Sequence, residues 1–166
     1  MIKPEKLSKE VVDLLLLGLQ KEYEHSYFYQ SVSNWCASNG YVQAAEFFLK
    51  ESDEEVGHAR RFQNYLIDWN VTPQLPTNKT PRILEFRNLL HCIEEIYDNE
   101  INLYEEYNDI SMKIFKCGDI NAFDFMQFYR DAQKSSVTTF SDMLNKLEGV
   151  DVNDKFKMLL LQEKLF

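Results

Sequence analysis

Residues 70–83 read NVTPQLPTNKTPRI and divide the chain into two halves of similar character. Pro73, Pro76 and Pro81 exclude a continuous helix here, because each proline lacks an amide donor and clashes with the preceding helical turn. Each half contains two segments with helical apolar spacing, separated by only a few residues, which predicts an antiparallel helix hairpin. The proline-rich segment is long enough to run extended along a bundle. The pattern therefore predicts two hairpins joined by one long crossover.

Four long helices and one short helix are expected from the apolar spacing and from the glycines that end three of the segments. Their approximate ranges are 6–38, 41–69, 84–115, 120–147 and 153–165. We expect helices to end at Gly40, Gly118 and Gly149, and we expect Asp119 and Asp151 to act as N-caps. The short segment carries an apolar run over 158–161 and requires a partner surface, in this chain or in a neighbouring one. We predict an all-α chain, a four-helix bundle with a short fifth helix, as a single domain over 1–166.

The composition limits the classes of partner that the chain can have. It has 166 residues, with 27 acidic and 18 basic side chains and a net charge of -9. Such a chain is repelled by phosphate backbones and by anionic membrane surfaces, so neither nucleic acid nor a membrane is an expected partner. Apolar stretches such as Leu14–Leu17 are too short to span a bilayer, and the N-terminus does not resemble a signal peptide. We therefore expect a cytoplasmic protein.

The inward-facing stripes of the four long segments are apolar or aromatic except near their middles. The midpoint of each expected helix falls at or beside a polar residue, and these are Glu22, Glu55, Glu100 and Gln133. Midpoints of helices of equal length lie in one cross-section of a bundle, so these side chains and His58 are expected to meet inside it. Buried carboxylates without compensation are costly, and no Lys or Arg occupies a central stripe position. A bound metal is the expected compensation.

The segment Glu55-Val56-Gly57-His58 supplies a ligand pair with defined geometry. Residues at i and i+3 lie on one helix face, so a carboxylate oxygen of Glu55 and an imidazole nitrogen of His58 can reach one ion. A carboxylate-rich set with a single imidazole suits iron or manganese, whereas zinc is more often held by several nitrogen or sulfur ligands. The spacing thus predicts a metal centre at the middle of the bundle.

Short motifs accompany the predicted centre on all four long segments. They are Lys21-Glu22-Tyr23, the run Tyr29–Cys36, the run Asp53–His58, Asn99-Glu100, and Phe128-Tyr129 followed by Gln133. Together they resemble the ferritin family, specifically bacterial non-haem ferritins with a ferroxidase centre. The resemblance covers essentially the whole chain. It implies an iron-storage protein that oxidises Fe(II) with O2 at a di-iron centre and deposits ferric mineral inside a hollow homo-oligomeric shell, usually of 24 subunits.

The resemblance also implies a role for each ligand of the centre. Glu22 and His58 would hold the first iron, Glu55 would bridge the two ions, and Glu100 would hold the second iron. The implied enzyme activity is that of a ferroxidase, and two Fe(II) and O2 are its implied substrates.

Two further side chains would act beside the ions according to the resemblance. Gln133 would form a hydrogen bond or a loose ligand near the second iron, and Tyr29 would form a hydrogen bond and supply an electron. Bacterioferritins and related di-iron enzymes carry a second Glu-x-x-His on the fourth helix, where this chain reads Gln133-Lys134-Ser135-Ser136. That departure argues against haem-type ferritins and other di-iron oxidases.

Further departures predict what the centre does not contain. Many bacterial ferritins have a third iron site, but Ala132, Ser135 and Ser136 stand at its helix-four positions and leave only Glu54, so we expect the site to be absent. Val56 stands where bacterioferritins carry a haem-ligating methionine, so haem is not expected.

His25 lies one turn from Glu22 but off the inward stripe, and we expect it to be solvated or to face another subunit rather than to ligate metal.

Two alternative functions remain open. One is a degenerate shell subunit that stores iron without oxidising it. The other is a di-iron oxidase of a different type, which the missing second Glu-x-x-His disfavours.

Overall fold

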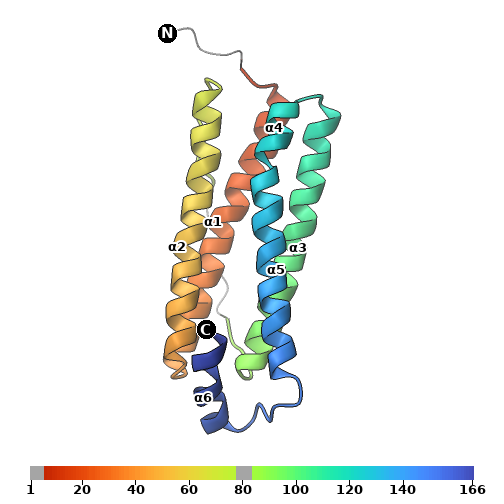
Figure 1. Cartoon of the computed structure of the whole chain (residues 1–166). Coiled ribbons are helices and arrows are strands. Elements are labelled where there is room, and N and C mark those ends of the chain that lie inside the picture. Colours follow the sequence, from red (N-terminus) through yellow and green to blue (C-terminus); the bar gives the residue numbers. More distant parts are fainter. Residues whose placement is uncertain (1–5, 78–83) are drawn as a thin grey trace.

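A computed structural model describes residues 6–77 and 84–166 of the chain. The described residues form six helices and no strand. Their bounds are α1 Lys9–Ser38, α2 Val42–Asp68, α3 Leu89–Lys116, α4 Ile120–Phe125, α5 Gln127–Leu147 and α6 Lys155–Leu165. The predicted fold class is confirmed: four long rods, with α4 and α5 together making the fourth, form a bundle with a short helix at one end (Figure 1).

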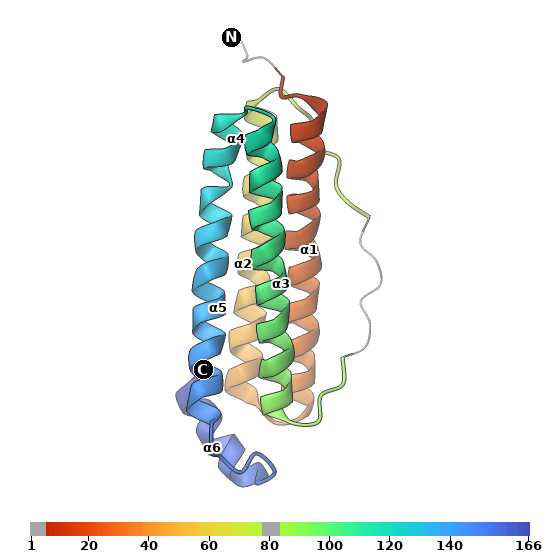
Figure 2. The ribbon, with the colours of Figure 1, turned by 90° about the vertical axis from the view of Figure 1, so that its right-hand side faces the viewer.

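The bundle consists of two hairpins. α1 packs mainly against α2, and α3 packs mainly against α5. Gly40 and Gly118 end α1 and α3 with φ angles of 82° and 78°, a left-handed conformation that glycine adopts without a steric penalty. The chain leaves α2 at the upper end of Figure 1 and enters α3 at the lower end, as the crossover prediction requires. Figure 2 shows the described parts of this connection beside α1; residues 78–83 of the predicted crossover lie outside the described residues.

Two helices begin later than the sequence pattern predicts, because a side-chain cap lies further along the chain. Ser8 Oγ accepts a hydrogen bond from the amide of Val11, so α1 begins at Lys9 rather than near residue 6. Asn88 has an extended backbone, and its side-chain oxygen accepts from the amide of His91 at 2.9 Å. Residues 84–88 are therefore not helical, and α3 begins about one turn later than predicted.

The predicted continuous helix over 120–147 is wrong in one respect, because Met126 separates α4 from α5. Met126 keeps a helical backbone (φ -68°, ψ -14°), so the interruption alters the hydrogen-bond ladder without turning the chain. The side chain of Arg130 spans the interruption, donating to the carbonyl of Phe123 at 3.4 Å and to the side chain of Gln127 at 2.6 Å. Asp119 caps α4 as predicted, accepting from the amide of Ala122.

The short helix α6 packs on its own bundle. Met158 is fully buried, Leu165 is nearly so, and the side-chain oxygen of Gln162 accepts from the amide of Ala44 at 3.4 Å. The N-cap is Asp154 and not the predicted Asp151, so the helix begins at Lys155. Both aspartates can cap a helix, and the later one does so here, its side chain accepting from the amide of residue 157.

The core has two apolar halves with a polar layer between them. The lower cluster, at the α6 end of Figure 1, is built around Tyr29, Phe48 and Phe140, whose rings stack with centroids 5.8–6.5 Å apart. The upper cluster includes Phe62 and Tyr129, with ring centroids 4.1 Å apart. Neither cluster contains the buried carboxylates, so the two apolar halves hold the helices and frame the polar layer. No helix in the described part of the chain is long and apolar enough to cross a membrane.

Candidate metal centre

The four residues predicted from the helix midpoints all lie buried at the middle of the bundle. Each comes from a different helix: Glu22 from α1, Glu55 from α2, Glu100 from α3 and Gln133 from α5. Their exposed fractions are 1%, 8%, 1% and 5% in that order. Three carboxylates inside one small bundle are unusual, because a buried charge needs a cation or a full set of hydrogen-bond donors.

Two of these carboxylates meet the imidazole of His58. Nδ1 of His58 lies 2.7 Å from Oε2 of Glu55 and 3.4 Å from Oε2 of Glu22. One ligand atom from each of the three residues can be chosen so that all lie within 4.8 Å of one another. A single cation placed among them would meet two carboxylates and one imidazole, a set typical of iron and manganese sites.

The carboxylate of Glu22 is incompletely satisfied. The hydroxyl of Tyr107 donates to Oε1, whereas Oε2 is buried and accepts no hydrogen bond within the described part of the chain. Such an oxygen is costly to bury, so it marks a place suited to a cation. Tyr107 lies on the inward stripe of its helix, but a tyrosine at helical spacing is ordinary core material, and the pattern did not single it out.

Glu100 has a denser set of partners than Glu22. Oε1 accepts from the hydroxyl of Tyr29 and lies 2.6 Å from Nε2 of His25. The side-chain amide of Gln133 donates to Oε2 and, at 3.1 Å, to the backbone carbonyl of Glu100. Tyr29 and Gln133 are thus both in contact with this carboxylate.

The expectation that His25 is solvated or faces another subunit is wrong for this chain. Its exposed fraction is 6%, and its ring lies edge-on to the ring of Tyr29 with centroids 5.0 Å apart. Successive residues of a helix are about 100° apart, so His25 lies about 60° from Glu22 and about 40° from Tyr29 around the axis of α1. The inward face of α1, which contacts both α2 and α3, is wider than a heptad stripe.

The electrostatics of the centre favour protonated imidazoles while no metal is bound. Burial alone would lower the pKa of His58, but Glu22 and Glu55 outweigh it and raise that pKa to about 10. Burial likewise opposes the charge of His25, yet mainly Glu100 raises its pKa to about 9. The pKa of Glu22 is raised to about 8, chiefly by burial. Burial would also raise the pKa of Glu55, but its hydrogen bonds and the nearby imidazoles lower it.

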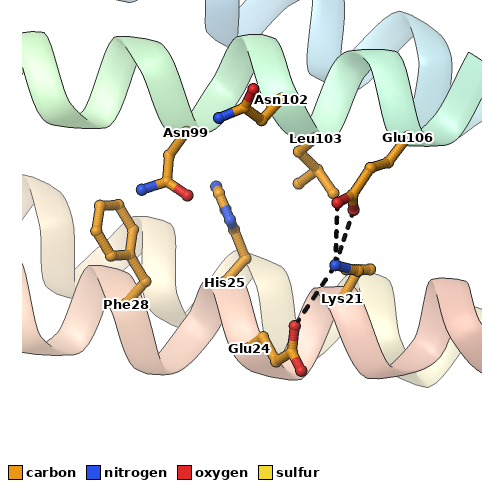
Figure 3. A pocket seen from close by; sticks show the side chains of 8 residues that line it. All are labelled: Lys21, Glu24, His25, Phe28, Asn99, Asn102, Leu103 and Glu106. Carbon is orange, nitrogen blue, oxygen red and sulfur yellow. Dashed lines mark hydrogen bonds and ion pairs between the residues drawn. The ribbon is translucent and has the colours of Figure 1, made fainter. Parts of the chain in front are cut away.

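The centre is reached from two faces of the bundle. A cavity of about 390 Å³ between α2 and α5 is lined by Glu55 and His58, together with Glu51, Glu54 and three hydroxyl side chains of α5. A smaller cavity of about 130 Å³ lies between α1 and α3. Figure 3 shows the second cavity, with His25 pointing from α1 towards Asn99 and Asn102 of α3 and Lys21 paired with Glu106 beside it.

The fold and the site together define a class of protein: a four-helix bundle with a buried centre of carboxylates and imidazoles, to which each of the four long rods contributes side chains. The family model for the ferritin-like domain matches residues 12–150. The chain belongs to the ferritin family.

Curated relatives align over most of the chain. It is 30% identical to a bacterial non-heme ferritin of Campylobacter jejuni, over 86% of this chain and 84% of that protein. It is 28% identical to a bacterial non-heme ferritin of Escherichia coli O157:H7, over 89% and 86%. An open pore ferritin from Archaeoglobus fulgidus has the same fold, with a TM-score of 0.89, 21% identity, and coverage of 96% of this chain and 98% of that one.

Proposed function

We propose that the chain stores iron and is itself a ferroxidase: it oxidises Fe(II) with O2 at the buried centre and delivers Fe(III) for deposition as mineral. Membership of the ferritin family and the names of the bacterial relatives support iron storage. Iron is both the substrate and the cargo of such a protein. The donor set fits it, because carboxylates and one or two imidazoles bind Fe(II) while leaving coordination positions open for oxygen.

The observation that carries the proposal is the buried group Glu22, Glu55 and His58. An apolar bundle of this size has no structural need for it, since buried carboxylates destabilise a fold unless they are compensated. Oε2 of Glu22 accepts no hydrogen bond within the described residues and lies 3.4 Å from Nδ1 of His58, so a cation bound between them would complete its partners. A degenerate subunit that stores iron without oxidising it would have no use for this group.

The residues act by holding and orienting the iron. Glu22 and His58 would hold the first Fe(II), Glu55 would bridge to the second, and Glu100 would hold the second. Gln133 and Tyr29 position Glu100 through hydrogen bonds on both of its oxygens. Tyr29 would supply an electron to the oxygen that is reduced at the centre, and its phenolic proton would pass to the carboxylate of Glu100, to which its hydroxyl donates a hydrogen bond.

The assembly belongs to the same proposal. A hollow homo-oligomeric shell, of 24 subunits, would surround the mineral, as membership of the ferritin family and the open pore ferritin with the same fold support. The cytoplasm is the proposed compartment. We propose no haem, because Val56 stands where bacterioferritins carry a haem-ligating methionine. We propose no third iron site, because Ala132, Ser135 and Ser136 line the α2–α5 cavity with Glu54 and offer no further carboxylate.

Aerobic addition of two Fe(II) per chain to the iron-free protein tests the activity. Oxygen consumption and the absorbance of the ferric product are followed, with buffer and a Glu22→Ala, His58→Ala double variant as references. Iron oxidation well above both references supports a ferroxidase. A rate equal to that of buffer rejects the activity and leaves the degenerate subunit, and a small oligomer in size-exclusion chromatography rejects the shell.

A further inference from the structure

The imidazole of His25 extends from α1 to the carboxylate of Glu100 on α3. We propose that His25 is a nitrogen ligand of the second metal ion, which it binds together with Glu100. The centre would then hold two carboxylate and imidazole pairs, one for each ion. The inference deepens the proposed function, because it adds a ligand to the second position of the same centre.

The contact between His25 and Glu100 matches the contact at the first position. Nε2 of His25 lies 2.6 Å from a carboxylate oxygen of Glu100, and Nδ1 of His58 lies 2.7 Å from a carboxylate oxygen of Glu55. In both pairs the imidazole N–H donates to a carboxylate while no metal is bound. A cation can replace that proton, because the same nitrogen and the same oxygen then become its ligands.

His25 is also placed as a ligand would be and not as an ordinary core histidine. It meets a carboxylate that already accepts hydrogen bonds from Tyr29 and Gln133. Glu100 therefore has enough donors without it. While no metal is bound, the protonated imidazole compensates the buried charge of Glu100, and the same imidazole supplies the nitrogen that the second position otherwise lacks.

The small cavity between α1 and α3 opens onto His25. Figure 3 shows the imidazole at the centre of the lining, with Asn99 on one side and Asn102 above it. The first position has a cavity of its own, because His58 lines the α2–α5 cavity. Each imidazole thus lines a cavity on a different face of the bundle.

The proposal changes what is expected of the second position. The resemblance to ferritins implies a weak second position, held by carboxylates and an amide. With a nitrogen from His25 and an oxygen from Glu100, that position binds borderline cations such as Zn²⁺ and Co²⁺ more firmly. We expect two tightly bound divalent ions per chain.

Anaerobic titration of the assembled, iron-free protein with Zn²⁺ tests the ligand without any redox chemistry. Isothermal titration calorimetry on the wild type is expected to show two tight ions per chain. His25→Ala weakens the second ion by more than about 100-fold, since loss of an outer-shell partner alone costs about 10–100-fold. His58→Ala weakens the first ion, and His91→Ala, on the far part of α3, changes neither.

Two variants separate ligation from mere positioning of Glu100. His25→Gln keeps a side-chain donor for Glu100 but offers no imidazole, so it is expected to lose the second ion as His25→Ala does. Tyr29→Phe removes a donor from the same oxygen of Glu100 and no ligand, so it weakens the second ion by less than about 100-fold. If His25→Gln binds the second ion as the wild type does, His25 is not a ligand.

A measurement on the wild type needs no variant to fold. X-ray absorption of the protein loaded with two Zn²⁺ per chain is expected to show one imidazole per zinc on average, and one imidazole per two zinc ions overturns the proposal. The result is independent of the proposed activity, because Zn²⁺ is redox-inactive. If both imidazoles bind zinc but the protein does not oxidise iron, the ferroxidase activity is rejected and the proposed role of His25 as a ligand stands.

Discussion

The two carboxylate and imidazole pairs of the centre are alike in geometry and unlike in origin. Glu55 and His58 lie three residues apart on α2, whereas His25 and Glu100 lie 75 residues apart on α1 and α3. The first pair is visible in one turn of sequence. The second exists only after α1 and α3 have packed, so no local spacing reports it. A pattern search therefore finds the half of a site that one helix contains and misses the half that two helices build.

The surroundings of the two pairs differ as well. Around the second pair, Tyr29 and Gln133 satisfy both oxygens of Glu100. Around the first pair, one oxygen of Glu22 accepts no hydrogen bond within the described residues. In the metal-free protein the carboxylate of the proposed second position is therefore more fully hydrogen-bonded than Glu22 at the proposed first position. We expect the first position to gain more from metal and to fill first.

The largest expected effect comes from Glu55, which the two proposed positions would share. Glu55→Ala removes the proposed bridging carboxylate, so it should weaken Zn²⁺ at both positions by more than about 100-fold and reduce iron oxidation to the rate of buffer. Calorimetry and oxygen consumption measure the two losses.

The matched control for this variant is Glu54→Ala, which removes an exposed carboxylate one residue away on the same cavity. It should leave both positions within about threefold of the wild type, because exposed charges contribute little. If Glu55→Ala weakened only one ion, the two positions would be independent and the bridging role would be lost.

Much of the frame around the two pairs was predictable from the sequence. Three glycines end helices where they were expected, and Glu22, Glu55, Glu100 and Gln133 were placed in one layer from helix midpoints alone. These predictions worked because breakers and apolar spacing are local properties that determine helix lengths.

The residues that escaped prediction share a physical reason: their roles depend on neighbours distant in sequence. His25 lies outside a heptad stripe, and only the joint packing of α1 on α2 and α3 buries it. Tyr107 has the spacing of a core residue, and its contact with Glu22 depends on how α3 lies against α1. The interruption between α4 and α5 at Met126 could not be predicted, because residues 120–147 contain no proline or glycine.

The second prediction uses pH to distinguish the positions. In the metal-free protein the pKa values of His58 and Glu22 are raised to about 10 and 8, and that of His25 to about 9. At neutral pH all three groups hold a proton that a bound cation must displace. Zn²⁺ affinity should therefore rise with pH, by about tenfold per unit for each displaced proton.

The pH dependence of Zn²⁺ affinity should be steeper at the first position than at the second. Below about pH 8 the first ion displaces protons from two groups and the second ion from one, so the first affinity rises more steeply. Above about pH 8 Glu22 is already ionised and the slopes converge. Calorimetry in buffers of different ionisation enthalpy counts the protons, and equal counts at neutral pH would contradict the difference between the pairs.

The third prediction compares the two tyrosines. Tyr107→Phe leaves Glu22 with no donor on either oxygen beyond the distant contact to His58, so the metal-free protein should lose about 1–3 kcal/mol of unfolding free energy. Tyr29→Phe should cost less, because His25 and Gln133 still donate to Glu100. Thermal unfolding with and without Zn²⁺ measures both. Zn²⁺ should reduce the difference in unfolding free energy between the two variants. If both variants lost the same unfolding free energy without metal, Glu22 and Glu100 would be equally well hydrogen-bonded, contrary to the prediction.

The smallest expected effect lies at the mouths of the two cavities. Lys21 pairs with Glu106 at 2.9 Å beside the α1–α3 cavity, and Lys50 pairs with Glu54 at 3.6 Å beside the α2–α5 cavity. Removing either lysine should change the free energy of unfolding by less than about 1 kcal/mol, as for other exposed ion pairs.

Each lysine also repels an approaching cation, so Lys21→Ala should speed the binding of Zn²⁺ at the second position alone, and Lys50→Ala should speed its binding at the first. The lysine at residue 50 is the more exposed and its charge the better screened, so stopped-flow binding at low salt should show the larger acceleration for Lys21→Ala. If Lys21→Ala accelerated both ions equally, the two positions would share one route, and the separate access of His25 and His58 would be wrong.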